Sequence, residues 1–240
     1  MYKEFLELDH RPFPLPSKPW IMTQVWRDML FMHWPVDAAF VRNRIPEDLE
    51  LDLFNDQAWI SVIPFRATNT RGRFLPLIPF MTAYLELNIR TYVVYQGVPG
   101  IYFFRIDANH LPTVVGARAY TGIPYCMADM TFLCENNKYF FSSLNKKERR
   151  EVKLAYQGED VLYEVEPGTL DHWLLERYCM YSIKGKHVYR GDIHHDKWKV
   201  TNGQVEVITG KGISLFSKTK PIVHFSRRRR AFTYPLEKVK

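Results

Sequence analysis

The sequence predicts an α+β fold of mostly antiparallel β-strands, curled into a barrel or into two packed sheets. Aromatic residues make up 15% of the 240 residues, and many stand in short runs such as "YVVY" and "IYFFRI", which favour strands over helices. Few stretches have a helical pattern, and those are short. No repeat and no Gly/Ser-rich linker divides the chain, so we expect a single domain over residues 1–240.

The first elements follow a proline-rich opening. Residues 20–36 predict either a long strand or an amphipathic helix, because periodicity alone does not decide. Residues 35–46 predict a short helix that Asp37 caps and Pro46 ends.

Turn residues separate the strands that follow. Pro76 and Pro79 stiffen an expected loop over residues 74–80. Three strand pairs are expected: one within residues 49–65 turning at Asn55-Asp56, one of strands 83–95 and 100–107 turning at residues 96–100, and one within residues 127–144 turning at Asn136-Asn137.

Two further short helices are expected. One covers residues 109–119, between two strand regions. The other follows Thr169 as its N-cap and places Leu170, Trp173 and Leu174 on one face. Residues 178–234 then predict further strands and turns.

The net charge of +7 raises the question of nucleic-acid binding. Its densest part is "SRRRR", residues 226–230, where successive arginines of a strand would point to opposite faces and form no single patch. No helix-turn-helix, zinc-finger or RNP pattern accompanies it. We expect a solvated basic edge, with a phosphate or acidic partner as the alternative.

Cysteine usage and the N-terminus suggest a location. The three cysteines, Cys126, Cys134 and Cys179, are odd in number and have no CxxC spacing, which favours free thiols over disulfides or zinc. The opening residues lack the basic start and apolar run of a signal peptide, and no apolar stretch is long enough to span a bilayer. We expect a cytoplasmic protein that has no membrane partner.

The strand around residues 83–90 carries the most informative pattern. Tyr84, Glu86, Asn88 and Arg90 alternate with Ala83, Leu85, Leu87 and Ile89, so the polar set shares one face. A solvent-facing side of a sheet explains this pattern, and so does the lining of a barrel cavity. The two readings stay open.

The segment "GARAYTGIPYCMADM", residues 116–130, ends the expected helix in a Gly-x-Pro turn. Gly122 permits unusual backbone angles, and Pro124 fixes its own φ and restrains Ile123. This turn either returns the chain to the sheet or aims Tyr125 at a site.

These two segments resemble motifs of acetoacetate decarboxylases. "AYLE" (83–86) is similar to their tyrosine-x-glutamate strand, and "RAYTGIPY" (118–125) to their arginine-glutamate-x-x-glycine-x-proline-lysine segment. Over nearly its full length the chain also resembles the YqjF-like family of uncharacterised proteins, in stretches such as "LELNIRTYV", "LLERYCMYS" and "IHHDKW". The resemblance implies a cone-like β-barrel with a few flanking helices and a central cavity.

The departures from the decarboxylase motif bear on chemistry. In that family the lysine forms a Schiff base with a β-keto acid, but Tyr125 occupies its position, Cys126 follows it, and Ala119 replaces the glutamate. A phenol cannot form an iminium ion, since this step needs a primary amine. We therefore expect Tyr125 to face the cavity as a hydrogen-bond donor.

Three other candidates favour structural roles. His194, His195 and Asp196 have metal-capable side chains, but neighbours on a strand diverge, so we expect hydrogen-bonded structural histidines and no metal. His33 stands between apolar residues as a core histidine. Cys126 has no histidine near it in sequence, which favours an inert thiol over a nucleophile.

Two classes of function follow, and a third stays open. The chain binds a small, anionic organic molecule without Schiff-base chemistry and without a cofactor, or it is an enzyme acting on a small organic acid with Glu86 as base and Tyr125 as acid. In either case Tyr84, Asn88, Arg90 and Arg118 are the expected ligand-binding residues, Arg118 through a forked contact with a carboxylate. A protein-interaction module is the third class, and a homo-oligomer is compatible with all three.

Overall fold

The computed structural model describes residues 2–77, 83–214, 216 and 219–240. Within this part of the chain, seven strands close into a barrel, because the first and last of them pair with each other. In order around the barrel they are β1 (Met22–Val36), β3 (Ala58–Gly72), β4 (Tyr84–Tyr95), β5 (Val98–Ala108), β11 (Cys179–Lys184), β12 (His187–His194) and β14 (Ile222–Lys238). All these neighbours are antiparallel except β5 and β11, which confirms the predicted fold class.

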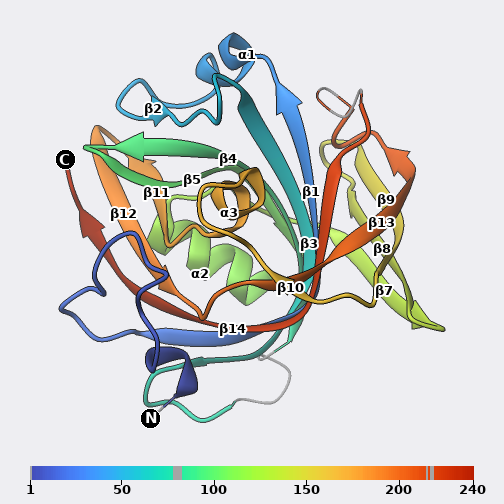
Figure 1. Cartoon of the computed structure of the whole chain (residues 1–240), viewed down its shortest axis with the longest axis horizontal. Helices are drawn as coiled ribbons and strands as arrows, with labels where there is room; N and C mark the ends of the chain where they lie inside the picture. Colours follow the sequence, from blue (N-terminus) through green and yellow to red (C-terminus); the bar gives the residue numbers. More distant parts are fainter. Residues whose placement is uncertain (1, 78–82, 215, 217–218) are drawn as a thin grey trace.

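A second sheet extends from the barrel through β14 and lies to one side of it in Figure 1. Its strands are β13 (Lys199–Gly210), β9 (Arg150–Gly158), β8 (Lys138–Asn145) and β7 (Asp129–Glu135). Short strands β2 (Glu50–Leu51), β6 (Tyr125–Met127) and β10 (Tyr163–Glu164) pair with β4, β5 and β13 respectively.

The helices are short. They are the 3₁₀ helix η1 (Lys3–Phe5) and the α-helices α1 (Ala38–Arg42), α2 (Leu111–Thr121) and α3 (Leu170–Leu175). Asp37 caps α1 and Thr169 caps α3, each accepting a backbone N–H as predicted. Helix α1 ends at Arg42, before Pro46 is reached.

The ambiguous segment 20–36 is a strand. β1 pairs with β14 along one edge and with β3 along the other. Met29 and Phe31 belong to the apolar cluster that includes the pocket wall, whereas Leu30, Met32 and Trp34 belong to the cluster that extends to the second sheet. Because both faces are buried, the run shows neither clean alternation nor a polar side.

The predicted turns are present, with one correction. Asn136 and Asn137 have φ values of 48° and 64° between β7 and β8, and Gln96 and Gly97 turn between β4 and β5. The chain also turns at Asn55-Asp56, where Phe54 and Gln57 form a short antiparallel bridge. The correction concerns the flanking strands, because β2 and β3 each pair with β4 and not with each other. Pro76 lies in the segment after β3, and Pro79 lies outside the described residues.

The arginine run lies on β14 and does not form one patch. Arg227 and Arg228 are exposed. Arg229 is buried, with its guanidinium 5.1 Å from the Trp198 ring centre and 2.7 Å from Asp196. Arg230 approaches Glu4 at 3.4 Å.

Candidate ligand pocket

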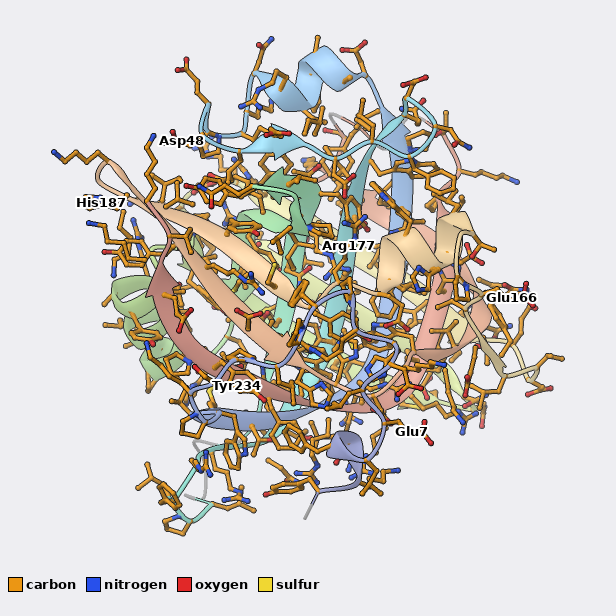
Figure 2. The ribbon with its side chains drawn as sticks, turned by 60° about the vertical axis from the view of Figure 1, so that its left-hand side comes forward. Glu7, Asp48, Glu166, Arg177, His187 and Tyr234 are labelled. Carbon is orange, nitrogen blue, oxygen red and sulfur yellow. The ribbon has the colours of Figure 1, made fainter. Side chains whose placement is uncertain are left out.

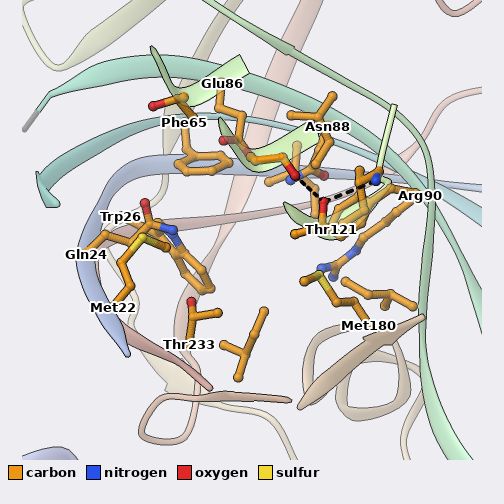
Figure 3. A pocket seen from close by; sticks show the side chains of 18 of the residues that line it. Met22, Gln24, Trp26, Phe65, Glu86, Asn88, Arg90, Thr121, Met180 and Thr233 are labelled. Atoms are coloured by element: carbon orange, nitrogen blue, oxygen red, sulfur yellow. Dashed lines mark hydrogen bonds between the residues drawn. The ribbon is translucent and has the colours of Figure 1, made fainter. Parts of the chain in front are cut away.

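A pocket of about 350 Å³ lies inside the barrel. All seven barrel strands contribute to its lining, together with α2, α3 and β6. Figure 3 shows the polar side chains of Glu86, Asn88, Arg90 and Thr121 toward one side and Met22, Trp26 and Thr233 toward the other.

The polar face of β4 lines this pocket. Tyr84, Glu86, Asn88 and Arg90 all take part in the lining, while Leu87 and Ile89 pack into the apolar cluster behind the strand. Of the two readings of the alternating pattern, the structure supports the cavity. The Tyr84 hydroxyl donates to Gln24 Oε1 at 3.1 Å.

Tyr125 reaches the same pocket through the Gly-x-Pro turn. Gly122 ends α2 in the left-handed region, with φ of 74°, and donates its N–H to the Arg118 carbonyl. The chain then enters β6, where Tyr125 pairs with Ile106 of β5. Tyr125 and Glu86 therefore open onto one cavity, as the acid–base hypothesis requires.

Arg118 is not among the lining residues and is exposed. The pocket-facing residues of α2 are Thr113, Gly116, Ala117, Tyr120 and Thr121. They follow the i, i+3, i+4, i+7, i+8 spacing of one helical face, and Arg118 falls on another. The structure does not bring Arg118 together with the other predicted site residues.

Burial controls the protonation of the polar wall. It raises the pKa of Glu86 to about 8, an effect that the Asn88 side chain partly offsets. Burial and then the nearby Glu86 also raise the pKa of Tyr125 and that of Tyr84. All three groups are therefore mostly protonated at neutral pH and can donate hydrogen bonds.

Arg90 is the charged group of this wall. Its Nη2 donates to the Leu174 carbonyl at 3.4 Å, and its Nε has no hydrogen-bond partner. No carboxylate of a described residue forms an ion pair with it. Arg177 also lines the pocket, but its Nη1 lies 2.6 Å from Asp52.

Arg177 is buried, and it lies near the centre of the view in Figure 2, whereas the exposed Glu7 and Glu166 lie near its edge. Its guanidinium is 4.9 Å from the centre of the Tyr92 ring, and that of Arg90 is 5.9 Å from it. Asp52 is the ion-pair partner of Arg177, and no described carboxylate pairs with Arg90, so this side of the pocket has an excess of positive charge.

The opposite wall is aromatic. The rings of Trp26 and Trp198 stack with centres 6.2 Å apart and planes 9° apart. Phe65, the cross-strand neighbour of Glu86, connects the two sides by meeting Trp26 edge-on. The sequence pattern had not identified these residues, or Arg177, as part of a site. They come from segments far apart in the chain that only barrel closure brings together.

The other predicted candidates have structural surroundings. His194 and His195 are buried, with His194 Nε2 2.5 Å from the Glu4 carbonyl and His195 Nδ1 2.8 Å from the Asp196 carbonyl. The described residues contain no cluster of three or more metal-ligating side chains. His33 is buried beside Ser61, with its Nε2 unpartnered. Cys126 is partly buried, and its Sγ lies 3.7 Å from the Pro124 carbonyl.

Comparisons with known proteins place the chain in a family. Residues 23–230 match the family of uncharacterized conserved proteins called DUF2071. The chain belongs to this family. The chain is similar to the uncharacterized protein YqjF of Bacillus subtilis (strain 168). The two are 41% identical over 230 residues, which cover 93% of this chain and 95% of YqjF.

Solved structures similar to this DUF2071 protein share its fold at low identity. The enduracididine biosynthesis enzyme MppR in complex with pyruvate has a TM-score of 0.65 at 8% identity, over 95% of this chain and 93% of MppR. An acetoacetate decarboxylase-like enzyme from Sphingomonas wittichii RW1 has a TM-score of 0.65 at 10% identity, over 96% and 99%. The acetoacetate decarboxylase of Legionella pneumophila has a TM-score of 0.61 at 15% identity, over 99% and 94%. The fold is thus of the acetoacetate decarboxylase type.

No helix among the described residues has the length and apolar character needed to cross a membrane.

Proposed function

We propose that this protein binds a small organic carboxylate in the barrel pocket, without a covalent bond. The observation that carries the proposal is Arg90, a guanidinium on the pocket wall that forms no ion pair with any described carboxylate. A buried charge without a counter-ion is costly. A carboxylate ligand would supply the missing charge and fork-shaped acceptor.

The protonation state of the wall supports an anionic ligand. With its pKa raised to about 8, Glu86 adds little negative charge at neutral pH and can donate a hydrogen bond. Tyr125 is a second donor on the same cavity. The solved structure of MppR with pyruvate shows a small carboxylate bound to a protein of this fold, which supports the same class of ligand here.

The side chains that line the pocket support non-covalent binding. The described residues that line the pocket include no lysine, and Tyr125 stands where the decarboxylase motif has its lysine. A Schiff base requires a primary amine, so a keto acid in this pocket would be held by hydrogen bonds and charge.

Isothermal titration with pyruvate, acetoacetate and larger carboxylates tests the proposal. Arg90→Gln should weaken binding about tenfold or more, since a hydrogen bond to a charged group contributes about 1.5–3 kcal/mol. Arg118→Gln is the matched control, because Arg118 is exposed and outside the lining. Equal losses in both variants, or no binding of any acid to the unaltered protein, would refute it.

A second candidate function is general acid–base catalysis on the bound acid. The specific observation is the pKa of Glu86, raised to about 8 beside Tyr125 in a buried site, because an effective catalytic group has a pKa near the working pH. Glu86 would act as an acid below pH 8 and as a base above it. The Tyr125 hydroxyl would remain a proton donor throughout.

Proton transfer can be observed directly as exchange of the protons next to the keto group of a bound 2-oxo acid in D₂O, followed by NMR. The rate should rise as pH passes 8, and Glu86→Gln should abolish it, while Tyr125→Phe should reduce it. If Glu86→Gln exchanges as fast as the unaltered protein, the catalytic role is wrong and binding alone remains.

A further inference from the structure

The pocket is larger than the shortest carboxylates need. A protein cavity of about 150 Å³ holds one benzene molecule, and this pocket measures about 350 Å³. Pyruvate has as many non-hydrogen atoms as benzene, so it would leave more than half of the space unfilled. The volume also reaches the range of about 300–1,000 Å³ found for pockets that enclose larger organic ligands.

The unfilled part has apolar walls. The ionisable Glu86 and Arg90 lie on β4, whereas β1, β3 and β5 contribute mainly apolar side chains: Trp26, Met29, Ile63, Phe65 and Phe103, with Gln24 and Thr70 as polar members, and Trp198 stacks on Trp26. Removing apolar surface from water is favourable, so this part of the pocket favours an apolar body over bound water.

We infer that the natural ligand is an arylalkanoic acid, with its carboxylate at Arg90 and its ring against the aromatic wall around Trp26 and Trp198. This inference rests on the proposed function and adds the substrate class. The separation of the two walls supports it, since Figure 3 shows Arg90 and Trp26 on opposite sides of the pocket. An aromatic ring can stack on indole rings and also fill the space between them and the polar wall.

A matched set of three compounds tests the inference by isothermal titration. 3-Phenylpropionate carries both charge and ring, propionate carries only the charge, and 3-phenylpropan-1-ol carries only the ring. We expect 3-phenylpropionate to bind at least about tenfold more tightly than propionate, because burial of a phenyl group is strongly favourable. It should also bind at least about tenfold more tightly than the alcohol, because of Arg90.

The outcomes separate the inference from the proposed function. Equal affinities of propionate and 3-phenylpropionate overturn the aryl inference and leave carboxylate binding intact. Equal affinities of 3-phenylpropionate and the alcohol, or no binding of either acid, overturn carboxylate binding and the inference with it.

Two tryptophan variants locate the ring. Trp26 is partly accessible and lines the pocket, so Trp26→Ala should weaken 3-phenylpropionate about tenfold and leave propionate unchanged. Trp20→Ala is the control, because Trp20 is also partly accessible but packs on Tyr2 and Phe232 outside the lining. If Trp26→Ala does not fold, Trp26→Leu replaces it. The placement of the ring is wrong if Trp26→Ala and Trp20→Ala lose the same affinity for 3-phenylpropionate. It is also wrong if Trp26→Ala loses as much affinity for propionate as for 3-phenylpropionate.

Discussion

Glu86 shows how one side chain depends on the cavity around it. An unperturbed glutamate has a pKa of 4.5, and burial raises the pKa of Glu86 to about 8. Between these values the folded protein holds a proton that the unfolded chain has released. The free energy of unfolding therefore contains a contribution that decreases as pH rises from 4.5 to 8.

Glu86→Gln should remove this dependence. Relative to the variant, the unaltered protein should lose stability with rising pH across this window, by up to about 1.4 kcal/mol per pH unit, and the difference should level off above pH 8. Urea unfolding at several pH values measures it. Exposed Glu166→Gln is the control. A stability difference for Glu86→Gln that does not change with pH would contradict the raised pKa.

At the residue scale the sequence predicted most of the polar wall. Alternation along residues 84–90 grouped Tyr84, Glu86, Asn88 and Arg90, and all four line the pocket. The alternating pattern could not show whether this face lies against solvent or against a cavity, because a solvent-facing strand and a cavity-lining strand have the same alternation. Arg118 was placed at the site by motif position, whereas the helical spacing of α2 puts it on another face.

At the scale of elements, α2 and its C-terminal turn position Tyr125. Gly122 needs its left-handed backbone, and a Cβ there would lie 2.7 Å from Lys184 Cγ. Gly116, on the same helix, has helical backbone and open space where a Cβ would lie. Gly116 within α2 and Gly122 just after it therefore differ in the backbone conformation that they require.

We predict opposite effects for the two alanine substitutions. Gly122→Ala should lower the free energy of unfolding by about 1–2 kcal/mol, because alanine is strained in the left-handed region. Gly116→Ala should raise it by about 0.5–1 kcal/mol, because alanine favours helices. Chemical denaturation of both variants tests the pair. A Gly122→Ala variant at least as stable as the unaltered protein would show that the backbone conformation at Gly122 is not limiting.

Elements with local signals were predicted well. The helix caps at Asp37 and Thr169 and the turn at Asn136-Asn137 depend on contacts within a few residues. A local sequence pattern is therefore enough to predict them. The choice of strand for 20–36 depends on two partners distant in sequence. The pairing of β2 with β4 likewise depends on tertiary contacts that no local pattern encodes.

At the scale of the whole molecule, the three thiols differ in exposure. Cys134 is exposed and Cys126 is partly buried. Cys179, the first residue of β11, is buried, and its Sγ lies 3.3 Å from the carbonyl of Pro99 on β5. Burial raises the pKa of Cys179 to about 11. Both its burial and its protonation protect it from thiol reagents.

The three cysteines should therefore react with an aromatic disulfide reagent at three different rates. Cys134 should react fastest and Cys126 more slowly, while Cys179 should react only at the rate at which the barrel opens. Cys134→Ser and Cys126→Ser assign the phases by mass spectrometry. Rapid labelling of Cys179 in the folded protein would contradict a stably closed barrel.

The pairing of β1 with β14 has a consequence for synthesis. During translation, β1 is made well before β14, the strand at residues 222–238 that closes the barrel beside it. Until those residues leave the ribosome, one edge of β1 lacks its partner, and the pocket lacks the wall that β14 provides. Ligand can therefore stabilise this protein only after residues 222–238 have been made, and the nascent chain must protect an unpaired strand edge until then.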